Sequence, residues 1–293
     1  MLKHNLRTLS LTALLLLVTA LWGWTFTVVK EAVAVYGVLA FLALRFAIGS
    51  AVLGAVSLRR VTKRSLLAGG GIGIALAAGY LFQTCGLRYT TATKSGLITG
   101  LFVILGPLAN RVLFGVRTGR LFSLAIGISI LGLLLLTGAE PSLVNVGDLL
   151  TLGAAAGFGL HIALLDRYAR PHAAVPLTLA QTSTAAVIFL AAWPCAEPLA
   201  WPPGEVWLAL GITGVLATAA ALLIQTFVQQ RLSAVRTAVI LTTEPLFAAL
   251  FGYLLAGDRL NALQVCGAVL MLAAVALAEV GAALSPRNKP PEI

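Results

Sequence analysis

The sequence predicts an all-α integral membrane protein, and three observations carry that prediction. Of its 293 residues, 59% are hydrophobic and only 10% are charged, whereas soluble domains carry roughly 25% charged residues. The apolar runs are about 20 residues long, the length of a membrane-spanning helix, and not the ~10-residue alternating segments of a barrel. The basic residues, which give a net charge of +10, lie in short segments between these runs. That distribution is typical of topology signals and argues against binding to nucleic acid.

Ten apolar runs follow one another along the chain, and each predicts one membrane-spanning helix. The first, about 9–29, follows the basic segment MLKHNLR; its length and its Trp22-Gly23-Trp24 favour an uncleaved helix over a signal peptide. The polar, proline-rich tail 286–293 is expected to be disordered. The other nine runs are expected at about 34–57, 66–87, 93–114, 121–138, 147–167, 175–194, 205–229, 237–256 and 262–283.

Two stretches of the chain, 94–127 and 236–267, resemble each other. Each begins with a basic residue, continues into an apolar run with a proline in its middle (Pro107 or Pro245), and ends in a polar hairpin followed by a glycine. The two prolines are 138 residues apart and the two glycines 140. Interrupted helices at equivalent places of a repeat indicate a transporter with a site near the membrane midplane. A duplication that serves packing alone is the alternative.

The basic residues also predict the orientation of the chain. With the N-terminus in the cytoplasm, 14 lysines and arginines fall in inside segments and 4 in outside segments, as the positive-inside rule requires. Five spans per half is an odd number, so the second half must enter the membrane from the opposite side. We therefore expect two inverted five-helix repeats, 1–140 and 141–285, around a central cavity, with both termini cytoplasmic.

Glu244 and Pro245 lie in the middle of the ninth run, where both are costly in lipid. Proline removes a backbone donor and crowds the carbonyl four residues back, here that of Leu241, and a carboxylate costs a few kcal/mol near the centre of a span. Such a defect survives only where protein or a water-filled cavity satisfies it. A functional Glu244, which binds a substrate amine or a proton, and a structural one, paired with Arg45 or Arg111, both remain open.

Other spans carry polar side chains at helical spacing, which must avoid lipid and either line a path or join helices. His161 shares a helix face with Gly153 and Gly157, whose spacing permits a close helix crossing. It could line the cavity or hydrogen bond at that crossing. Trp22 and Trp24 could stack on a substrate ring or fill a gap in the bundle. The remaining polar candidates are Tyr80, Gln83 and Thr84 in span three, Ser95 and Thr99 in span four, and Thr218, Gln225 and Gln229 in span eight.

Three segments give the chain a resemblance to a known family: TALWGWTFTVVKEA, TATKSGLITGLFVILGPL and AVILTTEPLFAALFGYLLAGDRLNALQVCGAVLMLAAV. They resemble the drug/metabolite transporter superfamily, and within it the ten-helix EamA type, over essentially the whole chain. One departure is Asp258, where the second half of the family usually has glutamate. The resemblance implies a multi-pass exporter of small metabolites, amino acids among them, in the bacterial inner membrane. It implies a cavity lined by Trp24, Tyr80, Gln83, Ser95, Thr99, His161, Gln225 and Thr242, with Phe158 adding to its aromatic content.

These observations favour a secondary transporter over an enzyme. The sequence has no ATP-binding Walker pattern and no paired aspartates, and Gly257-Asp258 falls in a hairpin. Its three cysteines have no metal-binding or pairing spacing, so we expect neither cofactor nor metal. The expected partners are a small-molecule substrate and membrane lipid, in a monomer or weak homodimer, with Pro107, Glu244 and Pro245 in gating or structural roles. Export of drugs or of other metabolites, such as nucleosides or sugars, and a membrane scaffold without flux are the alternatives.

Overall fold

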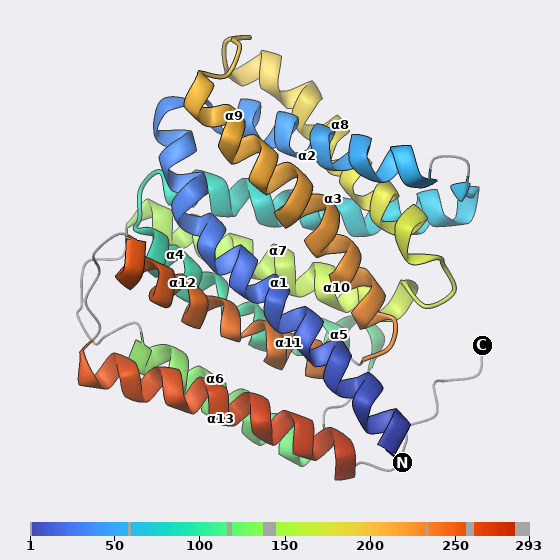
Figure 1. Ribbon diagram of the computed structural model, residues 1–293, viewed down its shortest axis with the longest axis vertical. Coiled ribbons are helices and arrows are strands. Elements are labelled where there is room, and N and C mark those ends of the chain that lie inside the picture. The colour runs from blue at the N-terminus through green and yellow to red at the C-terminus, as the bar shows by residue number, and fades with distance from the viewer. Residues whose placement is uncertain are drawn as a thin grey trace.

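Helices that run roughly alongside one another build the protein, as the computed structural model shows (Figure 1). The structure describes residues 2–57, 60–115, 119–136, 145–232, 234–255 and 261–284. No strand occurs within these ranges. The all-α prediction is therefore confirmed for the part of the chain that the structure describes.

The helical elements follow the order of the predicted spans. The first part of the chain contains α1 (Leu2–Val35), α2 (Val38–Ser57), α3 (Lys63–Leu87), α4 (Ala92–Thr99), α5 (Phe102–Phe114) and α6 (Arg120–Leu136). The second part contains α7 (Val146–Tyr168), α8 (Ala174–Ala196), α9 (Gly204–Gly211), η2 (Ile212–Ala220), α10 (Ala221–Gln229), α11 (Ala234–Leu241), α12 (Thr243–Leu255) and α13 (Ala262–Leu284).

Within the described ranges, seven helical stretches are long and apolar enough to cross a membrane: Leu9–Val35, Val38–Val56, Lys63–Leu87, Ala92–Phe114, Val146–Tyr168, Ala174–Ala196 and Gly204–Gln229. The other three predicted spans contain shorter apolar helices, Ser123–Gly132, Val239–Leu255 and Val265–Ala274. The multi-pass character is therefore confirmed, whereas the count of ten crossings and the inverted repeat stay predictions. The Gly257-Asp258-Arg259 hairpin and the tail 286–293 lie outside the described residues.

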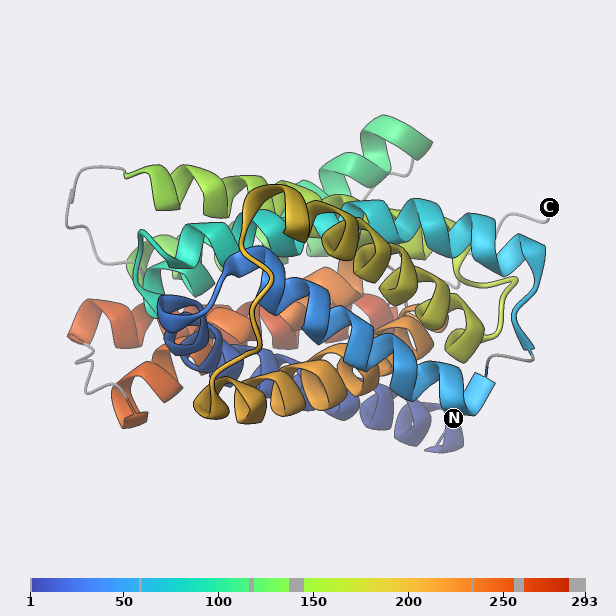
Figure 2. The same cartoon turned by 90° about the horizontal axis from the view of Figure 1, so that it is seen from above.

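The packing of the helices places elements from both parts of the chain next to one another. Helix α1 packs on α12, α5 on α7, α2 on α8, and α6 pairs with α13 along one edge of the bundle (Figure 1). Seen from above, α3 and α7 lie on one side of the bundle, and α1, η2 and α10 lie on the other (Figure 2). Helix α1 begins and α13 ends at the same end of the bundle.

The crossing of α3 and α7 is as close as the small residues of the sequence predict. A Cβ atom added to Gly157 would lie 2.6 Å from the backbone nitrogen of Gly79 and 2.8 Å from its Cα. At Gly153 the neighbour is instead the ring of Phe82, 3.2 Å from such an atom. Small residues on helices let the backbones approach, and here they bring α7 directly against α3.

Both proline-bearing spans are interrupted. Helix α11 ends at Leu241, the residue whose carbonyl Pro245 crowds, and α12 begins two residues later. In the earlier span the break falls at Gly100 and Leu101, and Pro107 lies further on, inside α5. The expected interruption at Leu241 is therefore confirmed, whereas the earlier one occurs at a glycine that lies ahead of its proline.

Span eight contains a feature that the sequence did not predict. Its middle, η2, is a π-helix of nine residues between α9 and α10. Segments of π-helix are rare, and they occur frequently at functional sites. The contacts of η2 with α1 and α2 place this one beside the centre of the bundle.

Candidate functional site

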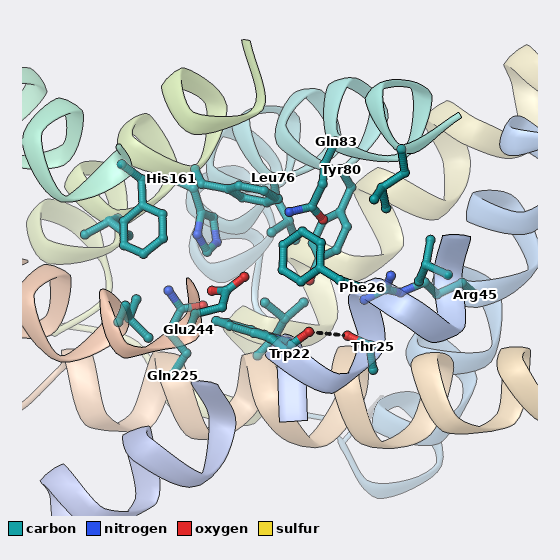
Figure 3. A pocket seen from close by; sticks show the side chains of 17 residues that line it. Trp22, Thr25, Phe26, Arg45, Leu76, Tyr80, Gln83, His161, Gln225 and Glu244 are labelled. Atoms are coloured by element: carbon teal, nitrogen blue, oxygen red, sulfur yellow. Dashed lines mark hydrogen bonds between the residues drawn. The ribbon is translucent and has the colours of Figure 1, made fainter. Parts of the chain in front are cut away.

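A cavity lies within the bundle, and residues from both parts of the chain line it. The aromatic residues of its lining are Trp22, Phe26, Tyr80, Phe102 and Phe158. The polar and charged ones are Thr25, Arg45, Gln83, His161, Gln225 and Glu244 (Figure 3).

Arg45, on α2, supplies the positive charge of the cavity. Arg45 is only 2% exposed. Its Nε donates a hydrogen bond to the hydroxyl of Thr218 at 2.9 Å, and its guanidinium carbon lies 4.5 Å from the centre of the Tyr80 ring. The sequence already indicated this residue as a candidate, because an arginine inside a membrane span is by default a candidate functional residue. We had expected it only as a partner for Glu244.

Glu244 supplies the negative charge. It is 6% exposed and lies in the first turn of α12, directly after the break in the ninth span. The ion pairs between described residues join Lys94 to Asp148 and Arg170 to Asp166, so no ion pair links Glu244 to Arg45 or Arg111. The proposed structural pairing is therefore not observed. The positive end of the α12 dipole favours a carboxylate at this position.

His161 lines the cavity, which is one of the two roles that the sequence left open. Its hydrogen bond is not at the crossing with α3, because its Nε2 lies 2.9 Å from Oε1 of Gln181 on α8. Gln181 in turn donates to Thr226 on α10 at 3.5 Å. This chain of side chains joins α7, α8 and α10 behind the cavity wall. The two glutamines predicted in span eight also differ in role. Gln225 lines the cavity, whereas Gln229 donates a hydrogen bond to the carbonyl of Ile162 at 2.6 Å.

The tryptophan of the cavity is Trp22, not Trp24. Residues two apart on a helix do not share a face, so only one of the pair can point inward. The indole Nε1 of Trp22 donates to the carbonyl of Ala217, in the π-helix, at 2.9 Å. Tyr80 and Phe158 do lie together as predicted, with ring centres 5.1 Å apart in an edge-to-face arrangement.

Three predicted site residues are buried but do not line the cavity: Ser95, Thr99 and Thr242. Thr99 accepts a hydrogen bond from Nε2 of Gln83 at 3.4 Å and so supports a residue that does. Ser95 lies 3.4 Å, hydroxyl to hydroxyl, from Thr151 on α7. Because the sequence fixes spacing along a helix but not its rotation, it could not separate the lining from this second layer.

Polar contacts also join the two parts of the chain at each end of α7. At its start, Asp148 forms an ion pair with Lys94 on α4 at 2.7 Å and accepts from the Thr90 hydroxyl at 2.9 Å. Near its other end, Asp166 accepts from the Asn110 amide on α5 at 3.0 Å. The broken fourth span is thus tied to α7 both before and after its break.

A multi-pass bundle of helices around a polar and aromatic cavity is the architecture of a small-solute carrier, and the comparisons agree. The model of the EamA-like transporter family matches residues 10–138 and again 145–279, so the chain belongs to that family. It is 34% identical over 264 residues to an uncharacterized transporter of Archaeoglobus fulgidus, covering 89% of this chain and 83% of that one. A crystal structure with 20% sequence identity superposes with a TM-score of 0.76, over 94% of this chain and 98% of the other. The protein is therefore a membrane transporter of small solutes.

Proposed function

We propose that the protein is a secondary transporter or facilitator that exports small metabolites, above all amino acids, across the bacterial inner membrane. It would act as a monomer or weak homodimer. The observation that carries this proposal is the lining of the central cavity, which combines aromatic rings with amide, imidazole, carboxylate and guanidinium groups. Sites for small ligands are mostly apolar, with a few polar groups that fix orientation. An aromatic or other neutral amino acid matches that combination in its chemistry.

We infer alternating access from how the two parts of the chain pack. Three contacts between helices each have a counterpart elsewhere in the bundle. The contact of α1 with α12 corresponds to that of α7 with α5, and the contact of α4 with α12 corresponds to that of α11 with α5. The contact of α3 with α8 corresponds to that of η2 with α2. Each pair of contacts is related by exchanging one five-span half for the other. This correspondence supports an inverted repeat, whose halves rock against each other around a fixed site.

The test is counterflow of labelled amino acids in proteoliposomes that contain the purified protein. We expect labelled phenylalanine or leucine to accumulate only in vesicles with the protein. Phe158→Ala, in the cavity, should reduce the rate at least tenfold, whereas Phe227→Ala, on a partly exposed position of α10 outside the cavity lining, should not. Equal rates in both variants would contradict the site. Counterflow of a hydrophobic cation or of a nucleoside, without that of any amino acid, would favour the drug or metabolite alternative.

The orientation has its own test. Reporter fusions at the two ends of the chain should both be active in the cytoplasm, since α1 begins and α13 ends at one end of the bundle. Reporters that are active on opposite sides of the membrane would overturn the arrangement of two inverted five-span halves.

A further inference from the structure

We propose that the cavity binds a zwitterion at two points, with Arg45 holding the anionic group of the substrate and Glu244 holding its cationic group. The proposal rests on the proposed transport function and narrows its substrate class. It assigns Arg45 a role beyond pairing with Glu244, as a residue that determines specificity.

The first step is that a guanidinium group and a carboxyl group are buried in one cavity without pairing. Arg45 and Glu244 are 2% and 6% exposed, and both line the same space. No ion pair within 4.0 Å joins them to each other or to another described residue. Figure 3 shows them reaching the pocket from separate helices, with Phe26 between them in this view. A buried charge without a counter-charge costs several kcal/mol, so this separation is expensive unless a ligand compensates it.

The second step is that the fold holds the guanidinium of Arg45 in place. Helix α2 meets η2 at two glycines: a Cβ atom on Gly214 would lie 3.1 Å from the Arg45 carbonyl oxygen, and one on Gly49 would lie 2.8 Å from Cγ2 of Thr218. This approach brings the Thr218 hydroxyl within 2.9 Å of Nε. Thr218 takes one of the five N–H donors of arginine and supplies no negative charge.

The Tyr80 ring contacts the same group. The guanidinium carbon is 4.5 Å from its centre and 5.9 Å from that of Phe46. Stacking on an aromatic face orients the planar guanidinium fork without neutralising its charge. An oriented, buried fork is the group that binds a carboxylate or another planar anion through charge-assisted hydrogen bonds.

The third step concerns the other end of the substrate. Glu244 lies in the view beside Gln225 and His161, with Trp22 below it (Figure 3). An ammonium group there would form a charge-assisted hydrogen bond with the carboxylate, and the electron-rich indole face would favour the same charge. The rings of Phe26, Tyr80 and Phe158 supply apolar surface for the body of the molecule.

The chemical class that satisfies all of these groups is a small zwitterion with an apolar or aromatic body, such as a neutral α-amino acid. A simple amine would leave Arg45 without an anion, and a simple carboxylic acid would leave Glu244 without a cation. Both are therefore expected to bind more weakly than the zwitterion that shares their body.

The experiment compares three molecules with one body: phenylalanine, phenethylamine and 3-phenylpropanoate. Binding to the purified wild-type protein should favour phenylalanine at least tenfold over either single-charge analogue. Arg45→Gln should lower phenylalanine affinity at least tenfold and shift the preference to the amine. Glu244→Gln should shift the preference to 3-phenylpropanoate. Thr218→Val removes the hydrogen-bond acceptor of Arg45 but no charge. It should weaken the binding of phenylalanine and of 3-phenylpropanoate but not that of phenethylamine.

The wild-type ranking tests the proposal even if a charge variant fails to fold. Either analogue binding as tightly as phenylalanine would overturn it, as would charge variants that weaken all three molecules equally. Counterflow of phenethylamine or of an uncharged solute at the phenylalanine rate would leave transport intact and refute two-point binding. Counterflow of no molecule tested would refute the transport function, whereas the binding comparison would still decide two-point binding.

Discussion

Gly157 is a position where the packing of α3 against α7 cannot accept a larger side chain. A Cβ atom there would meet three backbone atoms, at 2.6 and 2.8 Å in Gly79 and at 3.3 Å in Ala75. Ordinary contact begins at 3.4 Å, so the helices would have to separate by up to about 0.8 Å. Overpacking of this kind costs about 1–3 kcal/mol, and the better helix propensity of alanine returns at most about 1 kcal/mol. The net cost is then up to about 2 kcal/mol, so at about 2 °C per kcal/mol we expect Gly157→Ala to lower the unfolding midpoint by up to about 4 °C.

The assay is thermal unfolding of the purified protein in one detergent. Gly71→Ala is the matched control, because it lies on α3 in an exposed position where an added Cβ meets no atom within 4 Å. Its midpoint should equal or exceed that of the wild type. A Gly157→Ala protein as stable as Gly71→Ala would refute the claim that the two backbones are in direct contact at this crossing.

Three further predictions concern the connections around the cavity. Lys94, which is 31% exposed, forms an ion pair with the buried Asp148. A double-mutant cycle of unfolding should show a coupling energy of about 1 kcal/mol between them. Unfolding free energies of the two single variants that simply add would contradict this coupling. Pro107→Ala and Pro245→Ala should slow counterflow while the protein remains folded, because alanine removes the steric clash that weakens each helix; unchanged transport in both would exclude a gating role. Trp22→Phe removes the hydrogen bond to the π-helix and should cost about 1 kcal/mol of unfolding free energy, so a protein of unchanged stability would count against that bond.

Composition and periodicity predicted the parts of the structure that depend on them directly. The apolar runs gave the helices, and the chemistry of Pro245 gave the end of α11 at Leu241, because both depend only on local sequence. The choice between Trp22 and Trp24 required the rotation of α1, which its neighbours set. Both tryptophans lie in an apolar run, so no polar face indicated which one points inward.

The charged residues that line the cavity were also only partly predictable from the sequence. Glu244 was found because a carboxylate beside a proline is conspicuous in an apolar run. Arg45 was equally visible, and pairing with Arg45 or Arg111 was one of the two roles left open for Glu244. Only the structure shows that Arg45 and Glu244 line one cavity without forming an ion pair. The π-helix has no local signature, because its residues are the small and apolar ones of any membrane span.

The π-helix also fixes how far the chain of span eight can vary in length. Each π-turn closes on the fifth residue and not the fourth, so the nine residues of η2 take up more chain per turn than an α-helix does. One residue corresponds to about 100° around an α-helix. A single-residue deletion in this segment would let its wide turns tighten into an α-helix, which leaves Gln225 nearly in phase with the cavity. The same deletion would displace the Ala217 carbonyl and the Thr218 hydroxyl, through which η2 contacts Trp22 and Arg45.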